Sequence, residues 1–181
     1  MKKIVIIYGL IAGVISIAWF LGSMAVSGNG HFDVENGMYY GYATMLLAFS
    51  LIFVAIKNFR DKHNHGLISF GKAFRIGLFI TLIASTVYVG VWLIDYFYFI
   101  PDFMDRYAAH YLDKMKASGA TQAAISEQVA YFNKAKVWYK NPFFNALMTY
   151  AEILPVGLLV SLIAALILRR KTKTELQPQT A

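Results

Sequence analysis

Cysteine is absent from the 181-residue chain, and charged side chains make up only 15% of it. Without cysteine, no disulfide can hold an exposed loop, and no thiolate can serve as a nucleophile or a metal ligand. A soluble domain carries about 25% charged residues and about 45–50% apolar ones. This chain is 58% apolar and 16% aromatic. The excess of apolar residues indicates a membrane as its environment.

The sequence also lacks the short motifs of common enzyme classes. It contains no HExxH pair, no GxSxG turn and no glycine-rich phosphate loop. His63 and His65 lie close together without a further ligand nearby, and His31 and His110 are isolated. We therefore expect no cofactor, no metal site and no catalytic residue. The sequence favours a non-enzymatic protein, and a membrane-embedded lipid enzyme is a less favoured alternative.

The apolar residues fall into four long runs, at 4–26, 38–57, 73–100 and 143–168. A helix needs roughly 20 residues to cross about 30 Å of hydrocarbon, and each run meets that length. A transmembrane strand would alternate in polarity over about ten residues, whereas these runs are continuously apolar. The sequence predicts an all-α integral membrane protein, a single domain with four transmembrane helices.

The first run permits a second interpretation, as a cleaved signal peptide. Lys2 and Lys3 precede it, and Ser23 and Ala25 have the small-x-small spacing of a cleavage site. However, its apolar core is longer than the usual 7–15 residues of a signal peptide. We expect a retained helix, with cleavage as the alternative.

Lysine and arginine are unevenly distributed among the connections. The N-terminus, the turn between the second and third runs, and the C-terminal residues 169–181 hold most of them, whereas the first connection has none and carries Asp33 and Glu35. Basic loops remain in the cytoplasm, so both termini are expected there, with 169–181 as a basic, flexible tail. The net charge of +7 then reflects orientation and contact with anionic lipids, not nucleic acid.

The connection at 101–141 predicts a helical hairpin outside the cytoplasm. Its first arm has an apolar stripe that recurs every four residues, at Phe103, Tyr107, Tyr111 and Met115. Gly119 can end this arm, Thr121 can cap the second, and Asn141 before Pro142 can cap the last span. We expect the two arms to bury their apolar stripes against each other. The alternative is a docking surface for a protein partner, a ligand or a lipid.

Two carboxylates lie within the apolar runs. Asp95 follows Arg75 by 20 residues and Glu152 precedes Arg169 by 17, which is roughly 30 Å and 25 Å along a helix. Both are therefore expected in the outer part of the bilayer, where a charge costs less than at the centre.

The polar residues of the third run share one helix face, because they recur at steps of four and three: Thr81, Ser85, Tyr88, Trp92 and Asp95. We expect this face to be an inward seam whose hydroxyls bond to the backbone. The alternative is a hydrated groove or proton path that ends at Asp95, opposite Glu152.

The last run contains Pro155, which predicts a kink because proline cannot donate to the carbonyl of Ala151. Two sets of small residues permit close helix packing, in the last run Gly157, Ser161 and Ala165 and in the first run Gly9, Gly13, Ser16 and Ser23. We expect these two faces to pack together.

Four segments resemble one family: "YATMLLAFSLIFVAIKNFRD", "GLISFGKAFRIGLFITLIASTVYVGVWL", "IPDFMDRYAAHYLDKMKASGAT" and "KNPFFNALMTYAEILPVGLLVSLIAALIL". The family is the small bacterial four-span proteins known as domain of unknown function 4199. The stretches 69–72 and 152–155 look most like its signature. The resemblance covers the chain from the first span to Leu168 and implies a bacterial inner-membrane protein. It implies no activity, ligand or catalytic residue.

We therefore expect a non-enzymatic protein that serves interaction or envelope organisation within the lipid bilayer. A protein partner at the outer hairpin and a homo-oligomer are the expected associations. The main alternative is a small transporter or ion-conducting oligomer that uses Asp95 and Glu152.

Overall fold

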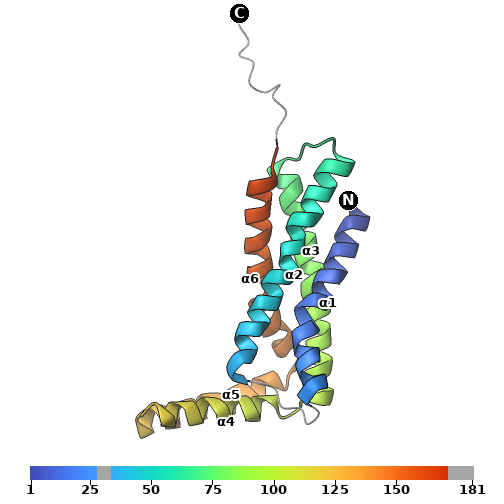
Figure 1. Ribbon diagram of the computed structural model, residues 1–181. Coiled ribbons are helices and arrows are strands. Elements are labelled where there is room, and N and C mark those ends of the chain that lie inside the picture. The colour runs from blue at the N-terminus through green and yellow to red at the C-terminus, as the bar shows by residue number, and fades with distance from the viewer. Residues whose placement is uncertain (28–33, 171–181) are drawn as a thin grey trace, which may run out of the picture.

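The computed structural model describes residues 1–27 and 34–170, and this part of the chain is built from helices (Figure 1). They are α1 (Lys2–Ser27), α2 (Val34–His63), α3 (Phe70–Ile94), the π-helical turn η1 (Asp95–Phe99), α4 (Phe103–Ala117), α5 (Gln122–Tyr139) and α6 (Pro142–Leu168). The predicted all-α class is confirmed. The tail beyond Arg170, His31 and Asp33 lie outside the described residues.

Among the described residues, three helices are long and apolar enough to cross a membrane. They are Tyr39–His63, Phe70–Phe99 and Pro142–Leu168, and they coincide with the second, third and fourth predicted spans. These three helices indicate a membrane protein. The first predicted span, 4–26, falls on α1, which is not one of the three.

The long helices α1, α2, α3 and α6 run side by side, and α3 packs against both α1 and α6 (Figure 1). The start of α1, the α2–α3 turn and the last turn of α6 lie at one end, which we call the turn end. Helices α4 and α5 lie across the opposite end, which we call the hairpin end. The packed core of the long helices includes Phe49, Ile52, Ile76, Ile80 and Ile153, all fully buried.

Small residues bring α6 and α3 close together. A Cβ added at Gly157 would overlap the side chain of Thr81, and one at Gly77 would lie 2.7 Å from Ser161 Oγ. Helices can approach this closely only where one side of the contact lacks a side chain.

The small residues of α1 also pack on α3. A Cβ at Gly9 would lie 2.8 Å from Ile83, and one at Gly13 would lie 2.7 Å from Val87. The expectation that the small faces of the first and last spans pack together is therefore wrong. Each face packs instead on α3, because α3 supplies a partner side chain for each glycine.

At the turn end, backbone and side-chain hydrogen bonds join α2, α3 and α6. Ile68 N donates to Arg170 O at 3.1 Å, and Arg170 N donates to Ile68 O at 2.9 Å. The Arg60 guanidinium donates to Leu168 O at 3.3 Å and pairs with Asp61. A cation at this position satisfies one of the free carbonyls that end a helix.

The resemblance stretch 69–72 caps α3. Ser69 Oγ accepts from Lys72 N at 3.4 Å, and Lys72 Nζ donates to Asn64 Oδ1 at 2.9 Å. This stretch therefore fixes the α2–α3 turn.

The hairpin confirms the capping signals of the sequence. Gly119 ends α4 with a φ of +78°, a value that favours glycine. Thr121 Oγ1 accepts from Ala124 N at 3.3 Å, and Asn141 Oδ1 accepts from Phe143 N at 2.9 Å. The start and end of each arm are thus set by local chemistry.

The two arms bury part of their apolar stripes against each other, as expected. The buried residues of this small core are Met104, Ala108, Phe132, Ala135 and Tyr96. The rings of Tyr107 and Phe132 meet edge to face at 6.0 Å, and Lys136 forms an ion pair with Asp105. Tyr107 and Tyr111 of the first arm's stripe also line a cavity.

Candidate functional site

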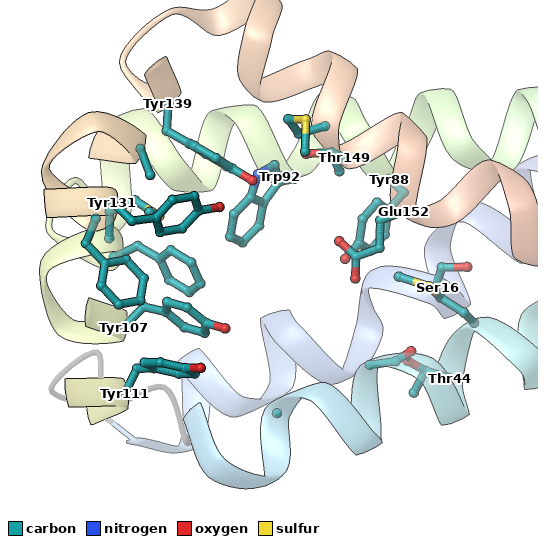
Figure 2. Close-up of a pocket in the computed structure, with 18 of the residues that line it drawn as sticks. Ser16, Thr44, Tyr88, Trp92, Tyr107, Tyr111, Tyr131, Tyr139, Thr149 and Glu152 are labelled. Atoms are coloured by element: carbon teal, nitrogen blue, oxygen red, sulfur yellow. Dashed lines mark hydrogen bonds between the residues drawn. The ribbon is translucent and has the colours of Figure 1, made fainter. Parts of the chain in front are cut away.

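A cavity of about 460 Å³ lies between the hairpin and the long helices (Figure 2). All six helices contribute to its wall. The lining residues are Ser16, Gly37, Gly41, Thr44, Met45, Tyr88, Trp92, Phe103, Met104, Tyr107, Tyr111, Gln128, Tyr131, Phe132, Ala135, Tyr139, Met148, Thr149 and Glu152. The site therefore exists only when the hairpin is folded onto the long helices.

The polar face of α3 is divided between two environments, and its first half is sealed. Thr81 and Ser85 are both fully buried. The hydroxyls of Thr81 and Ser161 lie 3.2 Å apart, and Ser161 Oγ donates to Gly157 O at 2.7 Å. Thr81 thus lies at a contact between α3 and α6, where its hydroxyl meets the side chain of Ser161 and not, as expected, the backbone. Ser85 Oγ has no hydrogen-bond partner among the described residues.

The second half of that face lines the cavity, through Tyr88 and Trp92. Trp92 Nε1 donates to Asn145 Oδ1 at 2.9 Å. Asn145 is itself fully buried, and its amide nitrogen donates to Tyr139 O at 3.4 Å. One buried amide thus links α3, α6 and the end of α5, which fixes the indole at the cavity wall.

Glu152 contributes the one charged side chain among the lining residues. Figure 2 shows its carboxylate pointing into the cavity from α6. No hydrogen bond or ion pair joins it to another described residue, and no lysine, arginine or histidine lines the cavity. The Glu152 side chain is exposed where it lines the cavity, so its charge is accessible to a ligand there.

Asp95 occupies a different place. It is buried, with 5% of its surface exposed, at the first position of η1. It does not line the cavity, and its Oδ2 has no partner among the described residues. Asp95 follows Trp92 by three residues, which places it next to Trp92 on the same helix face, but it begins the π-helical turn and its side chain is not part of the cavity lining. The structure does not bring Asp95 and Glu152 together in one site.

Pro155 lies three residues beyond Glu152, inside α6. The helix continues through it from Pro142 to Leu168, and the kink remains a prediction. The resemblance stretch 152–155 thus contains the cavity carboxylate and the helix proline.

Tyrosines form the wall that faces Glu152. Figure 2 shows the hydroxyls of Tyr107, Tyr111, Tyr131 and Tyr139 pointing from the hairpin towards the cavity. Burial, together with the nearby Glu152 carboxylate, raises the pKa of the Tyr139 phenol. Its hydroxyl therefore stays protonated and available as a donor at neutral pH.

Several lining residues were not identified from the sequence as parts of a site. Tyr131 belongs to no stripe that we identified, and Gly37, Gly41 and Thr44 lie on α2 without any distinguishing pattern. The usable signal was the tyrosines of the hairpin, since Tyr107, Tyr111, Tyr131 and Tyr139 all line the cavity.

Metal chemistry finds no support at this site. Within residues 1–27 and 34–170, no three histidine, aspartate or glutamate side chains are grouped as metal ligands. The lining combines one carboxylate, several phenol hydroxyls and several apolar side chains.

Residues 7–170 match the model of one protein family, described as "Protein of unknown function (DUF4199)". No curated protein and no solved structure matches the chain.

Proposed function

The chain belongs to the DUF4199 family, and we propose that it is a non-enzymatic membrane protein that binds an amphipathic molecule in the cavity at its hairpin end. Binding there would serve the interaction or envelope-organising role expected from the sequence. The observation that carries the proposal is the cavity itself. Its volume of about 460 Å³ is within the range of about 300–1,000 Å³ typical of small-molecule sites.

We further propose that α1 is a fourth span, which makes the long helices a four-helix bundle in the membrane. Helix α1 has 26 residues, or about 39 Å, enough to cross about 30 Å of hydrocarbon. It packs along α3, and an apolar face is directed away from the core, with Ile6, Ile7, Leu10, Ile11 and Val14 exposed. Lipid is the environment that suits such a face.

The proposed membrane is the bacterial inner membrane, with the turn end and both termini in the cytoplasm. Basic residues at the turn end support this orientation: Lys2, Lys3, Lys57, Arg60, Lys62, Lys72, Arg75, Arg169 and Arg170. The hairpin would then lie at the outer surface. Exposed aromatic side chains at that end, including Tyr98, Phe99, Trp138 and Phe143, suit the interface between lipid and water.

The orientation is tested with single cysteines, since the chain has no native one. A membrane-impermeant maleimide added to intact cells is expected to label Asp113→Cys on α4 and not Lys62→Cys at the turn end. The opposite labelling pattern would place the hairpin in the cytoplasm and overturn the orientation.

The binding function is tested by native mass spectrometry of the protein released from detergent micelles. The wild-type chain is expected to retain an additional mass of lipid size. Gly41→Leu should remove it, because Gly41 lines the cavity and an added Cβ there meets no atom within 4 Å, so the larger side chain would occupy the cavity.

Gly90→Leu is the matched control for this experiment. Gly90 is also helical with no atom within 4 Å of an added Cβ, but it does not line the cavity. A wild-type protein without a bound mass, or equal retention by Gly41→Leu, would refute the proposed function.

Transport through a single copy of the bundle has less support. Thr81 and Ser85 are fully buried, and Asp95 lies outside the lining of the cavity that contains Glu152. A homo-oligomer and a protein partner at the hairpin remain predictions.

A further inference from the structure

Resting on the proposed function, we infer that the cavity selects a lipid with a protonated amine in its head group, which binds between Glu152 and the tyrosine wall.

The charge of the cavity indicates a cationic group. Glu152 is the one charged residue in the lining, and no described lysine, arginine or histidine compensates it. A carboxylate in a cavity of low polarity is stabilised most by a cation brought close to it, and hydrogen bonds to charged groups are about twice as strong as neutral ones. An anionic head group would instead be repelled.

The aromatic wall favours the same chemistry. Tyr88, Trp92, Tyr107, Tyr131 and Tyr139 all line the cavity, and the faces of electron-rich rings attract ammonium groups within about 6 Å. The tyrosine hydroxyls, with the Gln128 amide, can donate to an acceptor such as a phosphate oxygen next to the amine. Carboxylate and phenols thus suit the two ends of a zwitterionic head group.

The depth of the cavity indicates a lipid as the source of the amine. Glu152 lies ten residues after Pro142, about 15 Å along α6. Helix α6 has 27 residues, about 40 Å, and so exceeds the hydrocarbon thickness of about 30 Å. The cavity therefore lies close to the level of the outer head groups.

The shape of the long helices leaves room for the lipid. Phe49 of α2 and Gly157 of α6 are in close contact, since a Cβ on that glycine would lie 2.9 Å from Phe49 Cζ. Towards the hairpin end, Thr44 and Gly41 of α2 and Glu152 and Met148 of α6 line the cavity instead. Helices α2 and α6 thus part beyond this contact, and apolar chains can follow the wall between them.

The test compares two short-chain lipids that differ only in the head group. Purified full-length protein in an uncharged maltoside detergent is titrated with dihexanoyl phosphatidylethanolamine or dihexanoyl phosphatidylglycerol, and binding is followed by calorimetry. The amine lipid is expected to bind at least about tenfold more tightly than the glycerol lipid. Free phosphoethanolamine separates a lipid source from a soluble amine and is expected to bind at least about tenfold more weakly than the amine lipid.

Glu152→Gln is the deciding variant, because it retains the shape of the side chain and removes the charge. It should weaken binding of the amine lipid by about tenfold or more, and it should not weaken binding of the glycerol lipid, because the repulsion of the anionic head group is removed. Asp95→Asn is the matched control, a carboxylate of similar depth outside the cavity, and it should bind as the wild type does.

Equal affinity of the wild-type protein for both lipids would overturn the amine inference and leave the proposed function intact. Binding of neither lipid, together with no retained mass, would overturn both. Unchanged amine-lipid binding in Glu152→Gln would also overturn the inference. If Glu152→Gln does not fold, the head-group comparison on the wild-type protein still decides.

Discussion

The two halves of α3 carry the same kind of polar face and have different surroundings. Towards the turn end, Ser85 is fully buried and Thr81 lies against α6, where Gly157 has no side chain and Ser161 a small one. Towards the hairpin end, Tyr88 and Trp92 line the cavity together with Thr149 and Glu152. Small side chains let helices approach closely. One half of the polar face is therefore sealed by close packing, and the other half borders the cavity.

The largest expected effect concerns the sealed half. Gly157→Ala should destabilise the protein by about 2–3 kcal/mol, since the new methyl group must displace the Thr81 side chain and Phe49 in a packed core. Thermal unfolding of the detergent-solubilised protein measures this difference.

Gly90→Ala is the matched substitution on the open surface of α3. No atom lies within 4 Å of its new methyl group, and alanine favours a helix over glycine by about 0.5–1 kcal/mol. A neutral or stabilised Gly90→Ala protein beside a destabilised Gly157→Ala protein confirms the contrast. Equal unfolding temperatures would mean that α3 and α6 do not pack as described.

The next effect concerns the open half, where one hydrogen bond fixes the cavity wall. Trp92→Phe removes the donor to Asn145 Oδ1 and should cost about 1–2 kcal/mol, because a buried acceptor loses its strongest partner. The same thermal unfolding measures it.

Trp138→Phe serves as the control for the indole, since Trp138 is exposed on α5 and should tolerate the change. If both substitutions have the same small effect, the amide link between α3, α5 and α6 does not hold the hairpin end in place.

The smallest effect is expected at Ser85. Its hydroxyl is buried without a partner among the described residues, so Ser85→Ala should be neutral or stabilise the protein by up to about 1 kcal/mol. Ser85→Cys should also resist a water-soluble maleimide that labels Glu152→Cys. Strong labelling at position 85, or clear destabilisation by alanine, would mean that water reaches the middle of α3, and transport would then become the better hypothesis.

Some features of the two halves could be predicted from the sequence, and others could not. The hairpin was predictable to within a few residues, because Gly119, Thr121 and Asn141 act on their own neighbours. The three membrane-length helices were predictable because continuous apolar character needs no knowledge of partners. The shared face of Thr81, Ser85, Tyr88 and Trp92 followed from helix geometry alone.

Which part of that face is buried and which part borders the cavity was not predictable, because this depends on the residues that lie opposite. Gly9 and Gly13 pack on α3 and not on α6, and this depends on which helices are neighbours in space. A one-dimensional pattern records which residues can approach closely but not which partner they meet.

By itself, the sequence determined an all-helical membrane protein, the ends of its hairpin and the faces of its helices, since these follow from local hydrogen bonding and hydrophobicity. The tertiary structure alone decided that Glu152 faces a cavity while Asp95 does not. It alone assembled the cavity wall from all six helices. The physical reason is that a cavity is the space left between packed elements, and its existence depends on the sizes of side chains that are far apart in the chain.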